Sequence, residues 1–275
     1  TIKHGILDHF SLSQNIGEKI AGNEFDLGEI LAMDKENNIV KIFNGNVNLS
    51  SESNTISPNT TSNFINGVLT NQKVILTSAS VDTIFVEANQ KTGQTNTFNV
   101  KHNVLDHFSL NLTSSQKNDQ FFTGDNTVIA QDKWNNTIVD FNDTVNITAS
   151  NATIVNDSIF VNGIANLSQK VKYTGNSGNI EFKVSFNESI GSSIIKIEPG
   201  DLNKVIIKEA SDGMGEEAKE HLMKVGESYN LYAAGYDVSN NYIGGINGEW
   251  SSQGSLDSIL DQSSSQLVFT PLLAE

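Results

Sequence analysis

The stretch Ile6–Leu12, with the sequence ILDHFSL, returns at Val104–Leu110 as VLDHFSL. The same offset of 98 residues relates Ala32 to Ala130. A period of this length is too long for a solenoid repeat and has the size of one small autonomous domain. The sequence therefore predicts tandem copies of a whole domain, which is typical of a rod or spacer rather than of a single binding pocket.

Short β-branched runs fill the first two copies, separated by Asn, Gly, Ser and Asp clusters that favour turns. In the run Val81–Ala88, VDTIFVEA, apolar and polar residues alternate, so one face of that strand is expected to enter a core. Strands are expected in the first copy at Ile6–Leu12, Phe25–Met33, Ile39–Leu49, Phe64–Leu69, Val74–Thr77, Thr83–Ala88 and Thr97–Val100. They are expected in the second copy at Val104–Leu110, Thr127–Gln131, Thr137–Thr148, Ile159–Ala165, Val171–Tyr173, Ile180–Phe186 and Ser193–Ile197. About seven short strands per domain predict an all-β fold of tandem immunoglobulin-like β-sandwiches.

Domain boundaries follow from the repeat. Residues 1–4 are expected to be the tail of a preceding repeat, because they parallel residues 99–102. Residues 5–101 and 102–199 are then two sandwich domains, and residues 200–275 are a third. The linker between the first two is short and has no Gly-Ser tract, so neighbouring domains are expected to be closely coupled. The array is expected to continue on both sides of this sequence.

The third segment has expected strands at Leu202–Lys208, Tyr229–Asp237, Tyr242–Trp250 and Gln266–Phe269. Compared with the first two copies, its last two strands are missing. An incomplete sandwich leaves an unpaired edge, so we expect this domain to be truncated or to be completed by a strand from elsewhere.

A helical period occurs in the acidic stretch of the third segment. Met214, Ala218 and Leu222 are four residues apart, which predicts a short surface helix.

Composition excludes several functions. The chain has 17 basic residues, all lysine, against 32 acidic ones, giving a formal net charge of −15 and no basic cluster for nucleic acid. It has no cysteine, hence no disulfide, thiolate metal site or thiol nucleophile, and no apolar run of about 18 residues that would span a membrane directly. It also lacks a Gly-x-Ser-x-Gly elbow, a phosphate loop and an HExxH motif, so no catalytic residue is predicted and the chain is expected not to be an enzyme.

Ten Asn-x-Ser/Thr sequons are candidate glycosylation sites of an exported surface, and most lie in the second copy. Together with the absence of cysteine, they favour a secreted prokaryotic protein. The sequons begin at Asn48, Asn59, Asn111, Asn135, Asn142, Asn146, Asn151, Asn156, Asn166 and Asn187.

One five-residue pattern occurs in all three segments, as DKENN at Asp34–Asn38, DKWNN at Asp132–Asn136 and DVSNN at Asp237–Asn241. The first interpretation is a tight turn in which Asp accepts hydrogen bonds from the following N–H groups and Asn adopts a left-handed φ. The second is a calcium site, because carboxylate and amide oxygens suit a hard cation. The spacing does not match an EF-hand loop, so we favour the turn. Calcium is the one cofactor that the sequence suggests, with ligands from Asp34, Asn38, Asp132, Asn136, Asp237 and Asn241.

Histidines and aromatic residues also recur. His4 and His102, like His9 and His107, occupy equivalent positions, which indicates packing or hydrogen bonding at the junctions rather than zinc. Trp134 replaces Glu36 in the shared pattern and is either packed against its own domain or exposed to a carbohydrate or protein partner. Phenylalanines that recur in register are predicted to lie in the cores, namely Phe10, Phe43, Phe64, Phe85, Phe108, Phe141 and Phe160.

Several of these runs resemble bacterial and archaeal immunoglobulin-like repeats of the invasin/intimin-like and related kinds. In the first copy the resemblance lies in Ala21–Phe25, Ala32–Val40, Phe43–Leu49, Thr55–Pro58, Phe64–Val68 and Gly93–Val100. In the third, Ala233–Asp237, Asn241–Gly244 and Trp250–Ser252 resemble a second variety of such repeats. The resemblance implies a cell-surface location, because such repeats form adhesin stalks, surface-layer subunits and spacers of exported proteins.

We therefore expect a structural segment of an extracellular, cell-surface protein, either part of a surface-layer (S-layer) lattice or a stalk. One alternative is an adhesin or carbohydrate-binding module that uses Trp134 or residues 211–222 to contact its ligand. Another is a filament subunit completed by strand donation. The expected partners are neighbouring copies or repeats of the same protein, with glycans or host-surface ligands if the chain is an adhesin.

Overall fold

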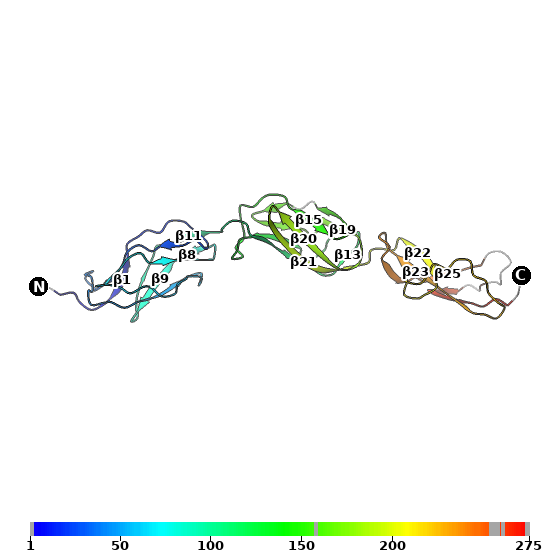
Figure 1. Cartoon of the computed structure of the whole chain (residues 1–275), viewed down its shortest axis with the longest axis horizontal. Helices are drawn as coiled ribbons and strands as arrows, with labels where there is room; N and C mark the ends of the chain where they lie inside the picture. Colours follow the sequence, from blue (N-terminus) through cyan, green and yellow to red (C-terminus); the bar gives the residue numbers. More distant parts are fainter. Residues whose placement is uncertain (1–2, 157–158, 253–258, 260–261, 273–275) are drawn as a thin grey trace. The chain divides into compact units, whose positions relative to one another are not determined.

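The computed structural model describes residues 3–156, 159–252, 259 and 262–272 (Figure 1). Every regular element among these residues is a β-strand, as the all-β prediction requires. No helix in this described part is long and apolar enough to cross a membrane.

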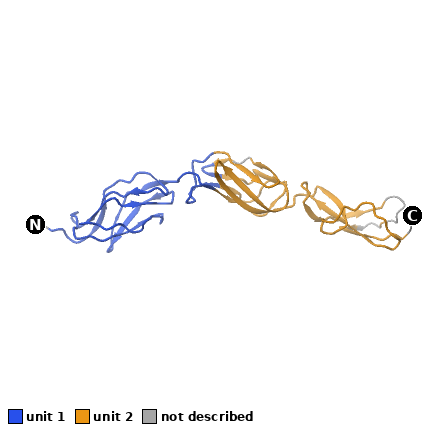
Figure 2. Ribbon diagram, in the orientation of Figure 1, with its two compact units in different colours: residues 1–107, 129–142, 161–164 blue, residues 108–128, 143–160, 165–275 orange. Residues whose placement is uncertain are grey.

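The chain divides into two compact units (Figure 2). Unit 1 contains residues 1–107, 129–142 and 161–164, and unit 2 contains residues 108–128, 143–160 and 165–275. The first repeat therefore lies entirely in unit 1, and the third lies entirely in unit 2. The second repeat contributes residues to both units. The three predicted domain boundaries remain a prediction.

The first repeat consists of two layers of short strands. Its strands are β1 His9–Leu12, β2 Lys19–Ile20, β3 Phe25–Asp26, β4 Ile30–Met33, β5 Asn48–Ser51, β6 Val68–Leu69, β7 Lys73–Val74, β8 Val81–Asp82, β9 Ile84–Ala88, β10 Lys91–Gln94 and β11 Phe98–Lys101. One layer contains the sheet β1-β4-β6 and the pair β3-β7, and the other contains β5-β9-β10 and β2-β11-β8. All of these pairs are antiparallel except β2-β11, which is parallel.

Strand alternation builds the core between these layers. Phe10 and Ile30 are buried on one sheet, and Leu49, Ile84 and Val86 are buried on the other. Successive side chains of a strand point to opposite faces, so each strand contributes every second residue to the core. The fold is an immunoglobulin-like β-sandwich.

A glycine in β10 lets the backbone of β1 approach closely. A Cβ atom on Gly93 would lie 2.3 Å from the carbonyl oxygen of Phe10. In the second repeat, a Cβ atom on Gly191 would lie 2.1 Å from the carbonyl oxygen of Phe108. The two glycines are 98 residues apart, so the repeat preserves this close approach.

Ten strands cover the second repeat: β12 His107–Asn111, β13 Gln116–Lys117, β14 Thr127–Gln131, β15 Asn146–Ala149, β16 Thr153–Asn156, β17 Phe160–Val161, β18 Ile164–Asn166, β19 Val171–Thr174, β20 Gly178–Phe186 and β21 Ser189–Glu198. Within unit 2 they form the sheet β13-β21-β20-β15 and the pair β16-β19. The pair β13-β21 is parallel, like β2-β11 in the first repeat. Phe122, Tyr173 and Phe182 pack together behind this sheet, with Phe182 5.4 Å from Phe122 and 5.5 Å from Tyr173 between ring centroids.

The third repeat has strands β22 Lys204–Lys208, β23 Tyr229–Tyr236, β24 Tyr242–Gly245, β25 Gly248–Trp250, β26 Gln262–Ser264 and β27 Gln266–Phe269. The sheet β22-β23-β24 carries β27 on β23, and β25 pairs with β26. Its buried apolar cluster includes Ala233, Trp250 and Leu267, whereas Val205 and Val268 remain about half exposed. Residues 253–258 and 273–275 lie outside the described part, so the expectation of a truncated or strand-completed domain stays a prediction.

Four local predictions were wrong. The strand expected at Thr137–Thr148 begins only at Asn146, because the N–H of Phe141 bonds to the carbonyl three residues back and forms a turn. The strand expected at Ile39–Leu49 begins only at Asn48, because the N–H groups of Lys41 and Phe43 bond to carbonyls two and three residues back and form turns. Phe85 is only half-buried, because Ile84 and Val86 on either side of it enter the core.

The surface helix predicted from Met214, Ala218 and Leu222 is absent. Gly213 has a φ of 74°, and Ala218 donates its N–H to the carbonyl of Ile207 in β22. Met214 and Leu222 are 84% and 94% exposed. An isolated helix this short is marginal in water, so pairing with β22 prevails.

Candidate functional site

Residues Asp34–Asn38, Asp132–Asn136 and Asp237–Asn241 form three turns of the same geometry, which we call the first, second and third aspartate turns. In each, the Asp N–H bonds to the carbonyl of the last Asn, and the fourth residue donates its N–H back to the Asp carbonyl. That fourth residue is left-handed in all three, with φ between 62° and 66°. Asn tolerates this conformation better than most residues, which accounts for its presence there.

The first aspartate turn shows what the carboxylate does. Asp34 Oδ1 accepts hydrogen bonds from the N–H groups of Glu36 (3.0 Å) and Asn38 (2.8 Å). Asp34 Oδ2 accepts the N–H of Gly5 (2.7 Å), which lies in the segment leading into the repeat. The side chain therefore ties the turn to the entry of the chain.

The second aspartate turn has the same arrangement, with Asp132 in the place of Asp34. Asp132 Oδ1 accepts the N–H groups of Trp134 and Asn136, both at 2.9 Å, and Oδ2 accepts the N–H of Asn103 at 2.9 Å.

The third turn does the same. Asp237 Oδ1 accepts the N–H groups of Ser239 and Asn241, both at 2.9 Å, and Oδ2 accepts the N–H of Gly200 at 2.8 Å. All three aspartates are buried, with 2% or less of their surface exposed.

Hydrogen bonds lower the pKa of all three carboxyls. The N–H of Gly5, followed by that of Asn38, lowers the pKa of Asp34 to about 2. Burial alone would raise the pKa of Asp132, but the hydrogen bonds from Asn103 and Asn136 outweigh it and hold that pKa below its usual range. Burial opposes the hydrogen bonds at Asp237 in the same way, and its pKa is also lowered. Each aspartate is thus ionised in the folded protein.

The second aspartate turn contacts the first repeat through the amide of Asn136. Its Nδ2 donates to the carbonyl of Thr77 (2.8 Å), and its Oδ1 accepts the N–H of Ala79 (2.8 Å). Asp132 orients the amide, because Nδ2 also bonds to Asp132 Oδ2 at 2.9 Å. We call this pair of bonds, from one Asn amide to a carbonyl and to the N–H two residues further on, the asparagine clasp.

The third aspartate turn makes the same clasp with the second repeat. Asn241 Nδ2 donates to the carbonyl of Gly175 (2.9 Å), and Asn241 Oδ1 accepts the N–H of Ser177 (2.7 Å). Asp237 Oδ2 again orients the amide at 2.9 Å. The loops at the two junctions differ in sequence. In both, the amide of the last Asn of the turn bonds to main-chain atoms of the loop in the same way.

The third residue of the turn adds a second contact that differs between the junctions. At the first junction Trp134 packs against the core of the first repeat. Its ring lies so close to Gly22 that a Cβ atom there would be 1.7 Å from Trp134 Cη2. Trp134 is therefore neither packed within its own repeat nor left free for a ligand, because the preceding repeat covers it.

At the second junction the equivalent contact is polar. Asn118 Nδ2 donates to Asp237 Oδ2 (2.8 Å) and to the hydroxyl of Ser239 (3.0 Å), and Asn118 Oδ1 accepts the N–H of Gly175 (2.8 Å). Asn118 is fully buried. The second junction therefore has a buried polar contact where the first has an aromatic one.

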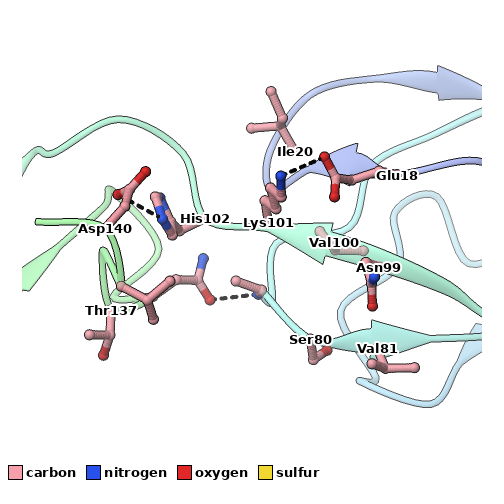
Figure 3. A pocket seen from close by; sticks show the side chains of 13 residues that line it. Glu18, Ile20, Ser80, Val81, Asn99, Val100, Lys101, His102, Thr137 and Asp140 are labelled. Carbon is pink, nitrogen blue, oxygen red and sulfur yellow. Dashed lines mark hydrogen bonds and ion pairs between the residues drawn. The ribbon is translucent and has the colours of Figure 1, made fainter. Parts of the chain in front are cut away.

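A groove of about 750 Å³ lies beside the first clasp (Figure 3). Two ion pairs border it, Lys101–Glu18 at 2.8 Å and His102–Asp140 at 3.1 Å. Lys101 is the last residue of β11 and His102 follows it directly, so the first contact joins β11 to Glu18 beside β2 and the second joins the linker to the second repeat.

The oxygens proposed as calcium ligands are already engaged. Both carboxylate oxygens of Asp34, Asp132 and Asp237 accept hydrogen bonds from N–H groups, and Asn136 and Asn241 face the preceding loops. No group of three His, Asp or Glu side chains is placed to hold a metal within the described part of the chain. Calcium at these six residues stays an untested prediction.

The predicted glycosylation sites lie at the surface. Nine of the ten sequon asparagines are exposed, and Asn156 is half-buried. Asn135 is exposed although its neighbour Asn136 is clasped, so a glycan there would sit beside the first junction. Glycosylation itself stays a prediction.

The aspartate turns are expected to weaken in acid. The folded pKa of Asp34, about 2, lies below the unfolded value of about 3.9, so its stabilising contribution is complete above about pH 4 and is lost as the pH falls through 2. We expect the amide resonances of Glu36 and Asn38 to shift, and their hydrogen exchange to accelerate, over this range. Asp34→Asn should remove the pH dependence at these two amides, and a dependence unchanged by that substitution would contradict the assignment.

Several residues of this site were not predicted. The sequence analysis identified Asn38, Asn136 and Asn241 as turn residues and as calcium-ligand candidates, but it predicted no contact between them and the preceding repeat. The turn itself requires left-handed φ at the fourth position, not an amide at the fifth. An Asn retained at the fifth position in all three copies was the available signal for a further role.

Comparison with protein-family models finds no match, and comparison with curated proteins finds none either. Among solved structures, the chain is similar to domains 4–9 of the surface layer protein SbsC, with 18% identity, a TM-score of 0.28, and coverage of 75% of this chain and 33% of that one. It is also similar to invasin, a bacterial integrin-binding protein (13% identity, TM-score 0.36, 89% of this chain and 50% of that one). A third is InvD of Yersinia pseudotuberculosis (16% identity, TM-score 0.35, 88% and 76%).

The chain spans a third of the length of the SbsC structure and half that of invasin. At these identities the likeness concerns fold alone. The fold and the junctions described above stand on the structure of this chain.

Proposed function

We propose that this chain is a structural segment of a cell-surface protein, in which successive immunoglobulin-like repeats are coupled. The observation that supports the proposal is the recurrence of the asparagine clasp at both junctions. The buried carboxylates Asp132 and Asp237 orient the two clasp amides, so the element that recurs in the repeats is the one that couples them.

The clasp amides are not available for contacts between molecules of a lattice. Asn136 and Asn241 satisfy both ends of their amides within the chain. A lattice contact would have to use other surfaces. The exposed sequons and the acidic excess suit an exported surface, and the extracellular location is part of the proposal.

The test is whether the clasp couples the motions of the repeats. We expect ¹⁵N relaxation of the full chain to give shared rotational correlation times across each junction. In Asn136→Ala with Asn241→Ala, the correlation times should separate and become shorter, because each substitution removes both clasp bonds. The matched control is Asn59→Ala, an exposed Asn whose side chain accepts only a bond of 3.5 Å from its neighbour Thr60.

Independent tumbling of the repeats in the unsubstituted chain would contradict the proposed coupling. The same measurement in calcium and in a chelator tests the calcium proposal. A calcium-dependent rise in the correlation times that Asp132→Asn abolishes would support it, and identical values in both conditions would exclude a role for calcium at the junctions.

A further inference from the structure

The first aspartate turn carries an asparagine that makes no clasp with any described residue. Within the described part of the chain, Asn38 Nδ2 bonds to Asp34 alone, at 3.2 Å to each carboxylate oxygen. Among the described residues, no group donates a hydrogen bond to Asn38 Oδ1. Asn38 is exposed, whereas Asn136 is half-buried and Asn241 is 9% exposed.

The rest of this turn is already in the geometry that the other two have when clasped. Asp34 accepts the N–H groups of Glu36, Asn38 and the entry residue Gly5, as Asp132 and Asp237 do with their equivalents. The carboxylate therefore fixes the amide of Asn38 before any partner is bound. A preorganised donor and acceptor lose little entropy on binding.

We propose that the first aspartate turn docks a further immunoglobulin-like domain of this kind, through an asparagine clasp made by Asn38. In that partner domain, the contact is made by the loop that follows the strand equivalent to β7 or β19. A main-chain carbonyl of this loop accepts a hydrogen bond from Asn38 Nδ2, and the main-chain N–H two residues further on donates to Asn38 Oδ1. This inference rests on the proposed function, because it extends the coupling to a third junction.

The two occupied clasps define the partner. Thr77–Ala79 and Gly175–Ser177 share no side-chain chemistry at the bonded positions, so what Asn recognises is the loop backbone. The docking domain must therefore have this loop geometry but needs no particular sequence there.

The third turn residue contacts the preceding repeat at both occupied junctions, but at different places. Trp134 faces Gly22, and Ser239 bonds to Asn118, which the strand pairing aligns with Ala21 rather than with Gly22. In the first turn the position is Glu36, which is exposed. The third position therefore varies between the turns, and the clasp itself depends on the Asn at the fifth position.

The experiment places a copy of residues 102–195 directly before Thr1 of the full chain. Thr1–Gly5 then take the place of residues 196–200 at the end of the copied repeat, and the copy presents its own Ser177 and Asn118 to the first turn. The readout is amide hydrogen exchange at Ser177 of the copy, with the copy segmentally labelled. We expect exchange there to be about tenfold slower than in the same chain carrying Asn38→Ala, as expected for one hydrogen bond.

The native Ser177, clasped by Asn241, is the internal reference. Protection at the native Ser177 but not at the copy overturns the docking proposal and leaves the proposed function intact. Absence of protection at both sites contradicts the clasp itself, and with it the proposed function.

A second variant needs no added domain. The first and second turns differ only at Glu36 and Trp134, so Trp134→Glu gives the second turn the sequence of the first, DKENN. If that sequence is competent to dock, the N–H of Ala79 stays protected in Trp134→Glu and loses its protection in Trp134→Glu with Asn136→Ala. Loss of protection in Trp134→Glu alone, with the fold retained, overturns the proposal.

Discussion

Replacing Asp132 with Ala is expected to destabilise the first junction by about 4 kcal/mol, because it leaves three N–H groups without an acceptor. Those groups belong to Asn103, Trp134 and Asn136. The carboxylate is fully buried, so water does not replace it without opening the turn. The substitution also frees the amide of Asn136, which Asp132 orients toward the first repeat.

Trp134 is a direct probe of this effect. The chain has two tryptophans, so in a Trp250→Phe background the fluorescence of Trp134 reports the junction alone. We expect the urea midpoint of that signal to fall in Asp132→Ala. Asp140→Ala is the matched control, since Asp140 is 78% exposed and its ion pair with His102 contributes less than about 1 kcal/mol. Equal midpoints for the two variants would show that the aspartate turn does not stabilise the junction.

The sequence predicts the sandwich well because the repeat and the strand alternation are both periodic. Ile84 and Val86 are buried as the pattern requires. Strand β10 was not expected, because Lys91–Gln94 is polar and lies on the sheet through backbone bonds to β9. Periodicity in hydrophobicity cannot detect a strand that contributes no apolar side chain.

The junctions were less predictable, for a different reason. The carboxylate turn follows from local rules, since Asp34 Oδ1 accepts the N–H groups of residues two and four positions further on. The clasp joins Asn136 to Thr77, 59 residues away, through main-chain atoms that have no sequence signature. Trp134 was considered only against its own repeat or a ligand, and the glycine that receives it lies more than a hundred residues earlier.

Replacing Gly22 with Ala is expected to cost about 3 kcal/mol, through two separable effects. Gly22 has a φ of 77°, which costs an L-residue roughly 1 kcal/mol. The added Cβ atom would also fall 1.7 Å from Cη2 of Trp134, so the ring must leave its place on the first repeat. The lost packing accounts for the rest.

A double-mutant cycle separates these effects. In a Trp134→Ala background the ring is gone, so Gly22→Ala should cost only the roughly 1 kcal/mol of the left-handed backbone. Gly17→Ala is the matched control, because a Cβ atom at Gly17 meets no atom within 4 Å and its φ is not left-handed, so it should stay within about 0.5 kcal/mol of the parent. Stability is best followed by amide exchange in the first repeat, which does not depend on the tryptophan signal. Additive costs for Gly22→Ala and Trp134→Ala would mean that the ring contributes nothing through Gly22, and the first junction would then depend on the asparagine clasp alone.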